Sequence, residues 1–136
     1  MSVFRPADSG EGTEVFTRYW RVRRDTDPER LAEAGLEMAR IIEASTVPLA
    51  NWEGEPGTEP EIDLDTGKVF FNGVGEEEDA YESFYWPPDL NHPSRDDPLW
   101  TFGFCKTGRL PYDEVVAACL LAAKDVLGEQ MEIASD

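Results

Sequence analysis

The segment FCKTGRLPYDEVV brings several reactive side chains together within a few positions. Lys106, Thr107 and Arg109 come just before an apolar, helix-like stretch, and Asp113 falls in its first turn. Cations beside the free N–H groups of a helix start favour a small anion or a carboxylate-bearing ligand. Together with Glu82, from an earlier segment, these residues form a candidate site for a small molecule or an enzymatic substrate.

The same segment is better explained as a corner between a strand and a helix. Asp113 and Glu114 already stabilise the positive end of the helix dipole and lie within reach of Lys106 or Arg109. A glycine at position 108 provides the bend, and a proline at position 111 suits the start of a helix. We therefore interpret the corner as self-neutralised and keep ligand binding as the alternative.

Two patterns that match known enzymes are incomplete. Lys106-Thr107-Gly108 matches a strand box of penicillin-recognising enzymes, but no serine in the chain has a lysine three positions later. Asp65-Thr66-Gly67 matches the aspartic-protease triplet, which needs a second carboxylate to share a proton, and its neighbours indicate a hairpin turn instead. Glycine-rich phosphate loops are absent from the sequence. The sequence thus predicts no catalytic residues.

Metal ligands and reactive thiols are also poorly represented. One histidine, His92, and two widely spaced cysteines, Cys105 and Cys119, do not make a structural zinc site. We interpret the acidic run 76–79 as a solvated turn, expect no metal or cofactor, and expect both thiols to stay reduced and buried. A nucleophilic set of Cys105, His92 and Asp96 is an alternative that nothing in the sequence places together.

The charge of the chain restricts its partners. Twelve Lys and Arg face 29 Asp and Glu, which gives a net charge of −17. Such a surface repels nucleic-acid phosphates and anionic lipids and attracts basic partners. The sequence has no apolar run near the ~20 residues of a membrane span and no stretch typical of a signal peptide, so we expect a cytoplasmic protein.

Hydrophobic periodicity predicts the elements that position these side chains. We expect strands over 13–22, 81–86, 99–106 and 131–135, a hairpin over 61–73, a helix that Asp27 caps and that ends near residue 45, and a helix over 111–127. Because hairpins dominate the middle of the chain, the fold class is α+β, with a mainly antiparallel sheet of four to five strands and two helices packed on one face. Residues 1–12 form a flexible tail, and residues 13–136 form one domain.

A resemblance covers roughly residues 69–136. The stretches FNGVGEEEDAYESFYW and FCKTGRLPYDEVVAACLLAAKDVLG, followed by EIASD, resemble small uncharacterised proteins of actinobacteria and their phages. The resemblance implies an accessory protein of phage or host and carries over no catalytic role. It also implies that relatives continue beyond Asp136.

These observations favour a small acidic protein that is not an enzyme and acts by binding another macromolecule. Trp52, Tyr85, Trp86 and Trp100 lie near proline-rich loops and are the candidate anchors for a protein partner. An acidic mimic of DNA that occupies a nuclease is one form of such a binder. The alternative is a small-molecule-binding protein or enzyme that uses the corner described above, and the oligomeric state stays open.

Overall fold

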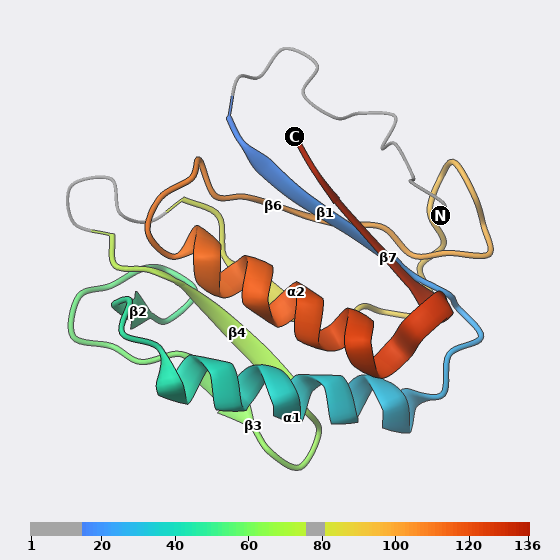
Figure 1. Ribbon diagram of the computed structural model, residues 1–136, viewed down its shortest axis with the longest axis horizontal. Coiled ribbons are helices and arrows are strands. Elements are labelled where there is room, and N and C mark those ends of the chain that lie inside the picture. Colours follow the sequence, from blue (N-terminus) through green and yellow to red (C-terminus); the bar gives the residue numbers. More distant parts are fainter. Residues whose placement is uncertain (1–14, 76–80) are drawn as a thin grey trace.

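Two helices lie side by side across one face of the strands (Figure 1). The protein is described by a computed structural model over residues 15–75 and 81–136, and the predicted tail 1–12 and the acidic run 76–79 lie outside this range. The elements are β1 (Thr17–Val22), α1 (Pro28–Ala44), β2 (Leu49–Ala50), β3 (Glu61–Asp63), β4 (Lys68–Gly73), β5 (Phe84–Trp86), β6 (Gly103–Lys106), α2 (Asp113–Leu127), a 3-10 turn η2 (Gly128–Gln130) and β7 (Met131–Ser135). The predicted α+β class is confirmed.

The strands form two antiparallel sheets rather than the single sheet of four to five strands that the sequence predicts. One sheet has the order β6-β1-β7, and the other has the order β2-β4-β3 with β5 also paired to β4. At the boundary, the Trp20 and Phe84 rings lie 5.2 Å apart, and one backbone hydrogen bond runs from Glu82 N–H to the carbonyl of Lys106. Strand propensity does not specify which strands pair, because pairing is decided by tertiary packing.

Helix α1 packs on the four-stranded sheet through small residues. Asp27 accepts a hydrogen bond from the Glu29 N–H and so caps the helix as predicted. Gly35 approaches the β3–β4 hairpin so closely that a Cβ added to it would lie 1.8 Å from the carbonyl oxygen of Gly67. The hairpin turn therefore rests directly on the helix backbone. A second contact comes from β5, where the indole N–H of Trp86 donates to the carbonyl of Leu31 on α1 at 2.9 Å.

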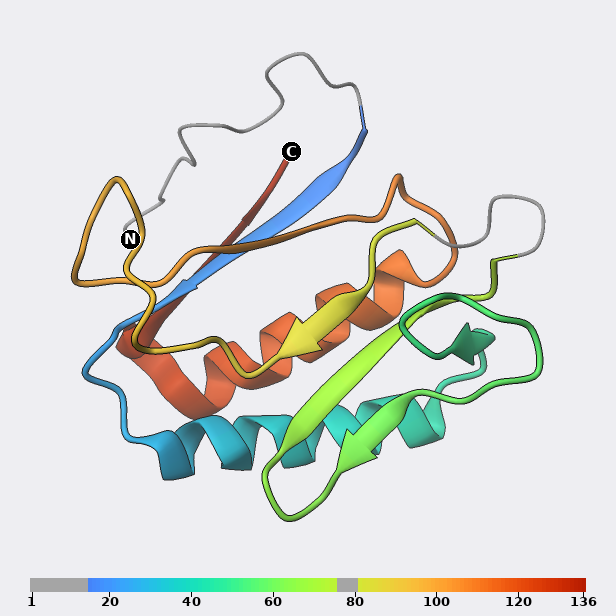
Figure 2. The same ribbon diagram turned by 180° about the vertical axis from the view of Figure 1, so that it is seen from behind.

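Helix α2 runs antiparallel to α1 and covers the three-stranded sheet (Figures 1 and 2). Val115, Cys119 and Leu120 are buried in the core, and the burial of Cys119 was predicted. Leu121, the next residue, is 60% exposed, so α2 keeps one apolar position open to solvent. Figure 2 shows the opposite side of the molecule, where no described helix covers the strands.

Candidate functional site

The Asp113 carboxylate at the start of α2 is held by a residue from the other end of the chain. Arg18 on β1 donates to both carboxylate oxygens, at 3.0 and 2.8 Å, and the hydroxyl of Thr107 donates to one of them at 2.6 Å. The sequence placed Asp113 within reach of Lys106 or Arg109, but Arg18 forms the ion pair, and Arg109 contributes only its charge. The arginine of β1 faces the helices, where burial requires a carboxylate partner.

The pKa of Asp113 reflects these contacts. Partial burial by itself raises the pKa of this carboxyl group, but the hydrogen bonds from Arg18 and Thr107 and the charges of Arg18 and Arg109 outweigh it. The net pKa of Asp113 is therefore lowered, and the group is ionised at neutral pH. A carboxylate that is already paired in this way is a structural group rather than a proton donor or acceptor.

Arg109 lies over an aromatic ring, and it acts on Asp113 through its charge without forming an ion pair among the described residues. Its guanidinium carbon lies 4.2 Å from the centroid of the Phe16 ring, and that of Arg18 lies 4.8 Å from the same centroid. Arg109 has a φ of 59° and follows Gly108, which has a φ of 61°. Two consecutive left-handed residues make the tight turn from β6 to α2, and cation–π contact fixes the arginine side chain.

Glu82 and Lys106 meet mainly through the backbone. The N–H of Lys106 donates to the Glu82 carboxylate at 2.9 Å, and the N–H of Glu82 donates to the Lys106 carbonyl at 3.2 Å. The hydroxyl of Tyr112, which is fully buried, donates to the carbonyl of Glu82 at 2.8 Å. Burial raises the pKa of Tyr112. These contacts close the edge of β6 and connect the two sheets, and they give the candidate residues a structural role.

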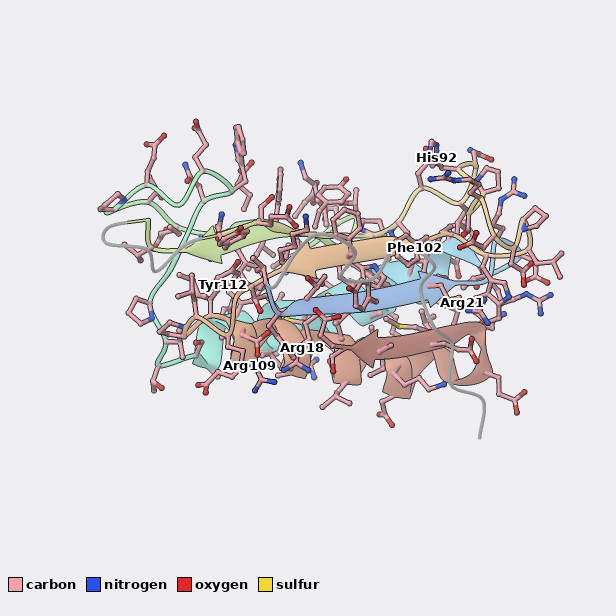
Figure 3. All side chains as sticks on the ribbon, turned by 90° about the horizontal axis from the view of Figure 1, so that it is seen from above. Arg18, Arg21, His92, Phe102, Arg109 and Tyr112 are labelled. Carbon is pink, nitrogen blue, oxygen red and sulfur yellow. The ribbon has the colours of Figure 1, made fainter. Side chains whose placement is uncertain are left out.

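Cys105 lies in a different environment from His92 and Asp96, the other two residues of the alternative nucleophilic set. Cys105 is buried on β6, where its thiol donates to the carbonyl of Glu82, whereas His92 and Asp96 are exposed in the loop before Trp100. Figure 3 shows His92 towards the opposite end of the molecule from Arg109. The alternative nucleophilic set is thus not assembled. Among residues 15–75 and 81–136, no group of three or more His, Cys, Asp or Glu could hold a metal ion.

The four candidate aromatic anchors divide into two pairs. Trp86 is fully buried in the core, and Trp100 is 9% exposed, with the guanidinium carbons of Arg21 and Arg23 at 4.2 and 5.6 Å from the centre of its ring. These two tryptophans are core residues, and the prediction that they anchor a partner was wrong. Trp52 and Tyr85 are 47% and 45% exposed, so they are available for contact.

The exposed pair is joined by a third ring that the sequence did not single out. Trp52 stacks on Phe70 at a centroid distance of 6.0 Å, and Tyr85 meets the same ring edge-on at 5.1 Å. Phe70 and Tyr85 are cross-strand partners on β4 and β5, and their neighbours Val69 and Trp86 face the core. Since side chains alternate along a strand, this group, which we call the aromatic row, lies on the face away from the helices.

Asn72 holds the two loops that flank the aromatic row. Its side-chain amide donates to the carbonyls of Trp52 and Tyr81, both at 3.2 Å, and its oxygen accepts from the N–H of Tyr81 at 3.3 Å. The side chain is buried although it is polar, because all of its hydrogen-bonding groups find backbone partners. In the sequence, Asn72 is a polar residue that directly follows the apolar run 69–71, and this was the available sign of its role.

Comparison with known proteins finds no matching family model, no similar curated protein and no similar solved structure. Within the described residues, neither helix is long and apolar enough to span a membrane. The candidate site therefore rests on the geometry of this chain alone.

Proposed function

We propose that the protein binds a basic protein partner through the aromatic row and has no catalytic activity. The observation that carries this proposal is the exposed row Trp52–Phe70–Tyr85 on the helix-free face of the four-stranded sheet. Large rings half exposed on a rigid sheet are the side chains that most often anchor protein interfaces. On the other sheet, Phe104 is a further exposed ring, at 48%, and lies 6.0 Å from the Phe102 ring.

Carboxylates around the aromatic row favour a basic partner. Glu61 is the cross-strand neighbour of Phe70, and Glu53 and Glu55 follow Trp52 in the same loop. A hydrogen bond with the Glu55 side chain, helped by the negative charge of that residue, raises the pKa of Glu53. Two carboxylates this close gain from a nearby cation, and aromatic faces attract lysine and arginine by cation–π interaction.

The net charge of −17 supports the same partner class. Long-range attraction would speed the encounter with a basic surface, and the rings would supply the short-range contact. The implied role is that of an accessory protein that occupies a basic region of another protein. Proteins that bind nucleic acids carry such regions, which is consistent with the role expected from the resemblance to phage and actinobacterial proteins.

Trp52 provides an internal reporter for the test, because Trp20, Trp86 and Trp100 are all buried. We would titrate the protein with a capped arginine octapeptide, and separately with its uncharged citrulline counterpart, at physiological ionic strength. The proposal expects quenching or a spectral shift of Trp52 fluorescence with the arginine peptide only. Tyr85→Ala should weaken binding roughly tenfold, the loss typical of one interface anchor.

The control is Leu64→Ala, which removes an exposed apolar side chain (62% exposed) outside the aromatic row. It should bind the arginine peptide as the wild type does. If Tyr85→Ala and Leu64→Ala bind equally well, attraction is due to net charge alone and the aromatic row is not the site.

A further inference from the structure

Strand β7 is one of the two edge strands of the three-stranded sheet, and no described strand covers its outer backbone edge. Strand β7 pairs with β1 and with no other described strand. Backbone hydrogen bonds join Arg23 N–H to the Gln130 carbonyl and Asp136 N–H to the Thr17 carbonyl at the two ends of this pairing. Because hydrogen-bonded pairs alternate in an antiparallel ladder, residues 132 and 134 also bond to β1, and residues 131, 133 and 135 point their backbone groups outwards.

On this outer edge, the backbone groups of Met131 already have hydrogen-bond partners within the molecule. The carbonyl of Met131 accepts from the Lys124 ammonium at 2.7 Å, and its N–H donates to the carbonyl of Gly128. Ile133 and Ser135 have no such partners among the described residues. Towards residues 15–75 and 81–136, each of them therefore offers one unpaired N–H and one unpaired carbonyl, which is the pattern that an added strand needs.

A groove runs beside these free groups. It has a volume of about 250 Å³ and lies between β7 and α2, with Ala117, Leu120 and Leu121 on the helix side. Leu121 is 60% exposed, so an apolar side chain from an added strand would find an apolar contact there. Arg18 also lines the groove, but its charge is already paired with Asp113.

Charge around the groove indicates which strand would bind. Glu114 and Asp125 are exposed and flank Ala117 and Leu121 on one stripe of α2, since positions three or four apart share a helix face. Neither carboxylate forms an ion pair with a described residue. They lie about 16 Å apart along the helix, close to the length of five residues in an extended strand.

We propose that the free edge of β7 and the groove beside α2 bind an extended segment of a partner protein, with apolar side chains flanked by lysine or arginine. A second copy of this chain fits less well, because it would bring two α2 stripes with Glu114 and Asp125 together. The β7 site lies on a different sheet from the aromatic row, and its existence does not depend on the function proposed above.

The probe is a capped seven-residue peptide with alternating valine and threonine and a lysine at each end. Amide hydrogen exchange is measured by NMR with and without the peptide. We expect the Ile133 and Ser135 amides to exchange rapidly in the free protein and slowly in the complex. The amides of Glu132 and Ala134, which bond to β1, should be protected in both states.

Two changes test the two parts of the site. Ser135→Pro removes an edge N–H that β1 does not use, and it should weaken peptide binding roughly three- to tenfold. Leu121→Ala should weaken it by a similar factor, whereas Leu64→Ala, whose side chain is equally exposed at 62% against 60%, should have no effect. A peptide with N-methyl groups on alternate residues should not bind, and this control needs no change to the protein.

Other results would overturn the proposal. The peptide could leave the exchange of Ile133 and Ser135 unchanged at millimolar concentration, or it could bind equally well when glutamates replace its lysines. Protection of the same amides that rises with protein concentration, together with a doubled mass by light scattering, would show that a second copy occupies the edge instead.

Discussion

Arg18 and Asp113 form a two-pronged ion pair that joins the middle of the three-stranded sheet to the first turn of α2, across 95 positions of sequence. The guanidinium and carboxylate planes meet through two parallel hydrogen bonds, and the side chains are 25% and 13% exposed. Geometry of this kind contributes more than an ordinary surface pair. The pair holds the strand-to-helix corner in place.

Arg18→Ala should therefore lower the free energy of unfolding by roughly 1–3 kcal/mol at neutral pH, measured by urea denaturation. Arg40→Ala is the matched control, because the Arg40–Glu37 pair is largely exposed, at 80% and 40%. That control should change stability by less than about 0.5 kcal/mol. An equal effect of the two substitutions would show that the corner does not depend on the ion pair.

The Arg18–Asp113 pair also makes the free energy of unfolding depend on pH. Because the pKa of Asp113 is lowered in the folded state, its contribution is complete above the ordinary value of 3.8 and is lost as pH falls through the lowered value. In Asp113→Asn this part of the acid-induced loss of stability should be absent. Urea midpoints from neutral pH to about pH 2 measure it, and parallel curves for both proteins would contradict the assignment.

Gly35→Ala should destabilise the protein although alanine favours helices. The added methyl group would lie 1.8 Å from the backbone oxygen of Gly67, so α1 and the hairpin must move apart. We expect a loss of at least about 2 kcal/mol in thermal or urea unfolding. At Gly57→Ala no atom lies within 4 Å, so this control carries only the backbone strain of a left-handed residue, whose φ is 83°, and no clash. Gly35→Ala should cost more than this control, and the reverse order would contradict the close contact.

Cys105 and Cys119 should react with a thiol reagent only as fast as the protein opens. Burial raises the pKa of each thiol to about 12, so very little thiolate exists at neutral pH. Labelling should be slow in native protein and complete within minutes in denaturant. Rapid labelling of native Cys105 would reopen the interpretation of that residue as a nucleophile.

Asn72→Ala should loosen the aromatic row. The substitution removes the hydrogen bonds to Trp52 and Tyr81 and should cost roughly 1–3 kcal/mol of stability. It should also increase the quenching of Trp52 fluorescence by acrylamide. Asn91→Ala, an exposed loop substitution, should change neither quantity. Unchanged quenching in Asn72→Ala would show that stacking on Phe70 alone holds the indole.

Local chemistry accounts for the elements that could be predicted. The Asp27-Pro28 start of α1, the glycine turn between β3 and β4, and the short strand β7 all follow from residues that are close in sequence. The division into two sheets does not, because it depends on which strands pair across the rings of Trp20 and Phe84. Strand patterns alone do not contain this information.

The same distinction applies to the candidate site. Exposure of Tyr85 and burial of Trp86 depend on which side of β5 each residue faces, and register decides this. Arg18 interrupts the apolar alternation of its strand, and that interruption was the one local sign of a buried ionic partner. Its partner, Asp113, could not be identified without the fold.

The position of β1 has a consequence for the order of folding. This strand is synthesised before its two neighbours, yet it forms the centre of a sheet whose other members, β6 and β7, begin at Gly103 and Met131. The α1 helix and the hairpin of β3 and β4 involve near neighbours and can assemble on a nascent chain. The three-stranded sheet must wait until residue 135 has left the ribosome, so we expect its long-range pairing to limit the folding rate.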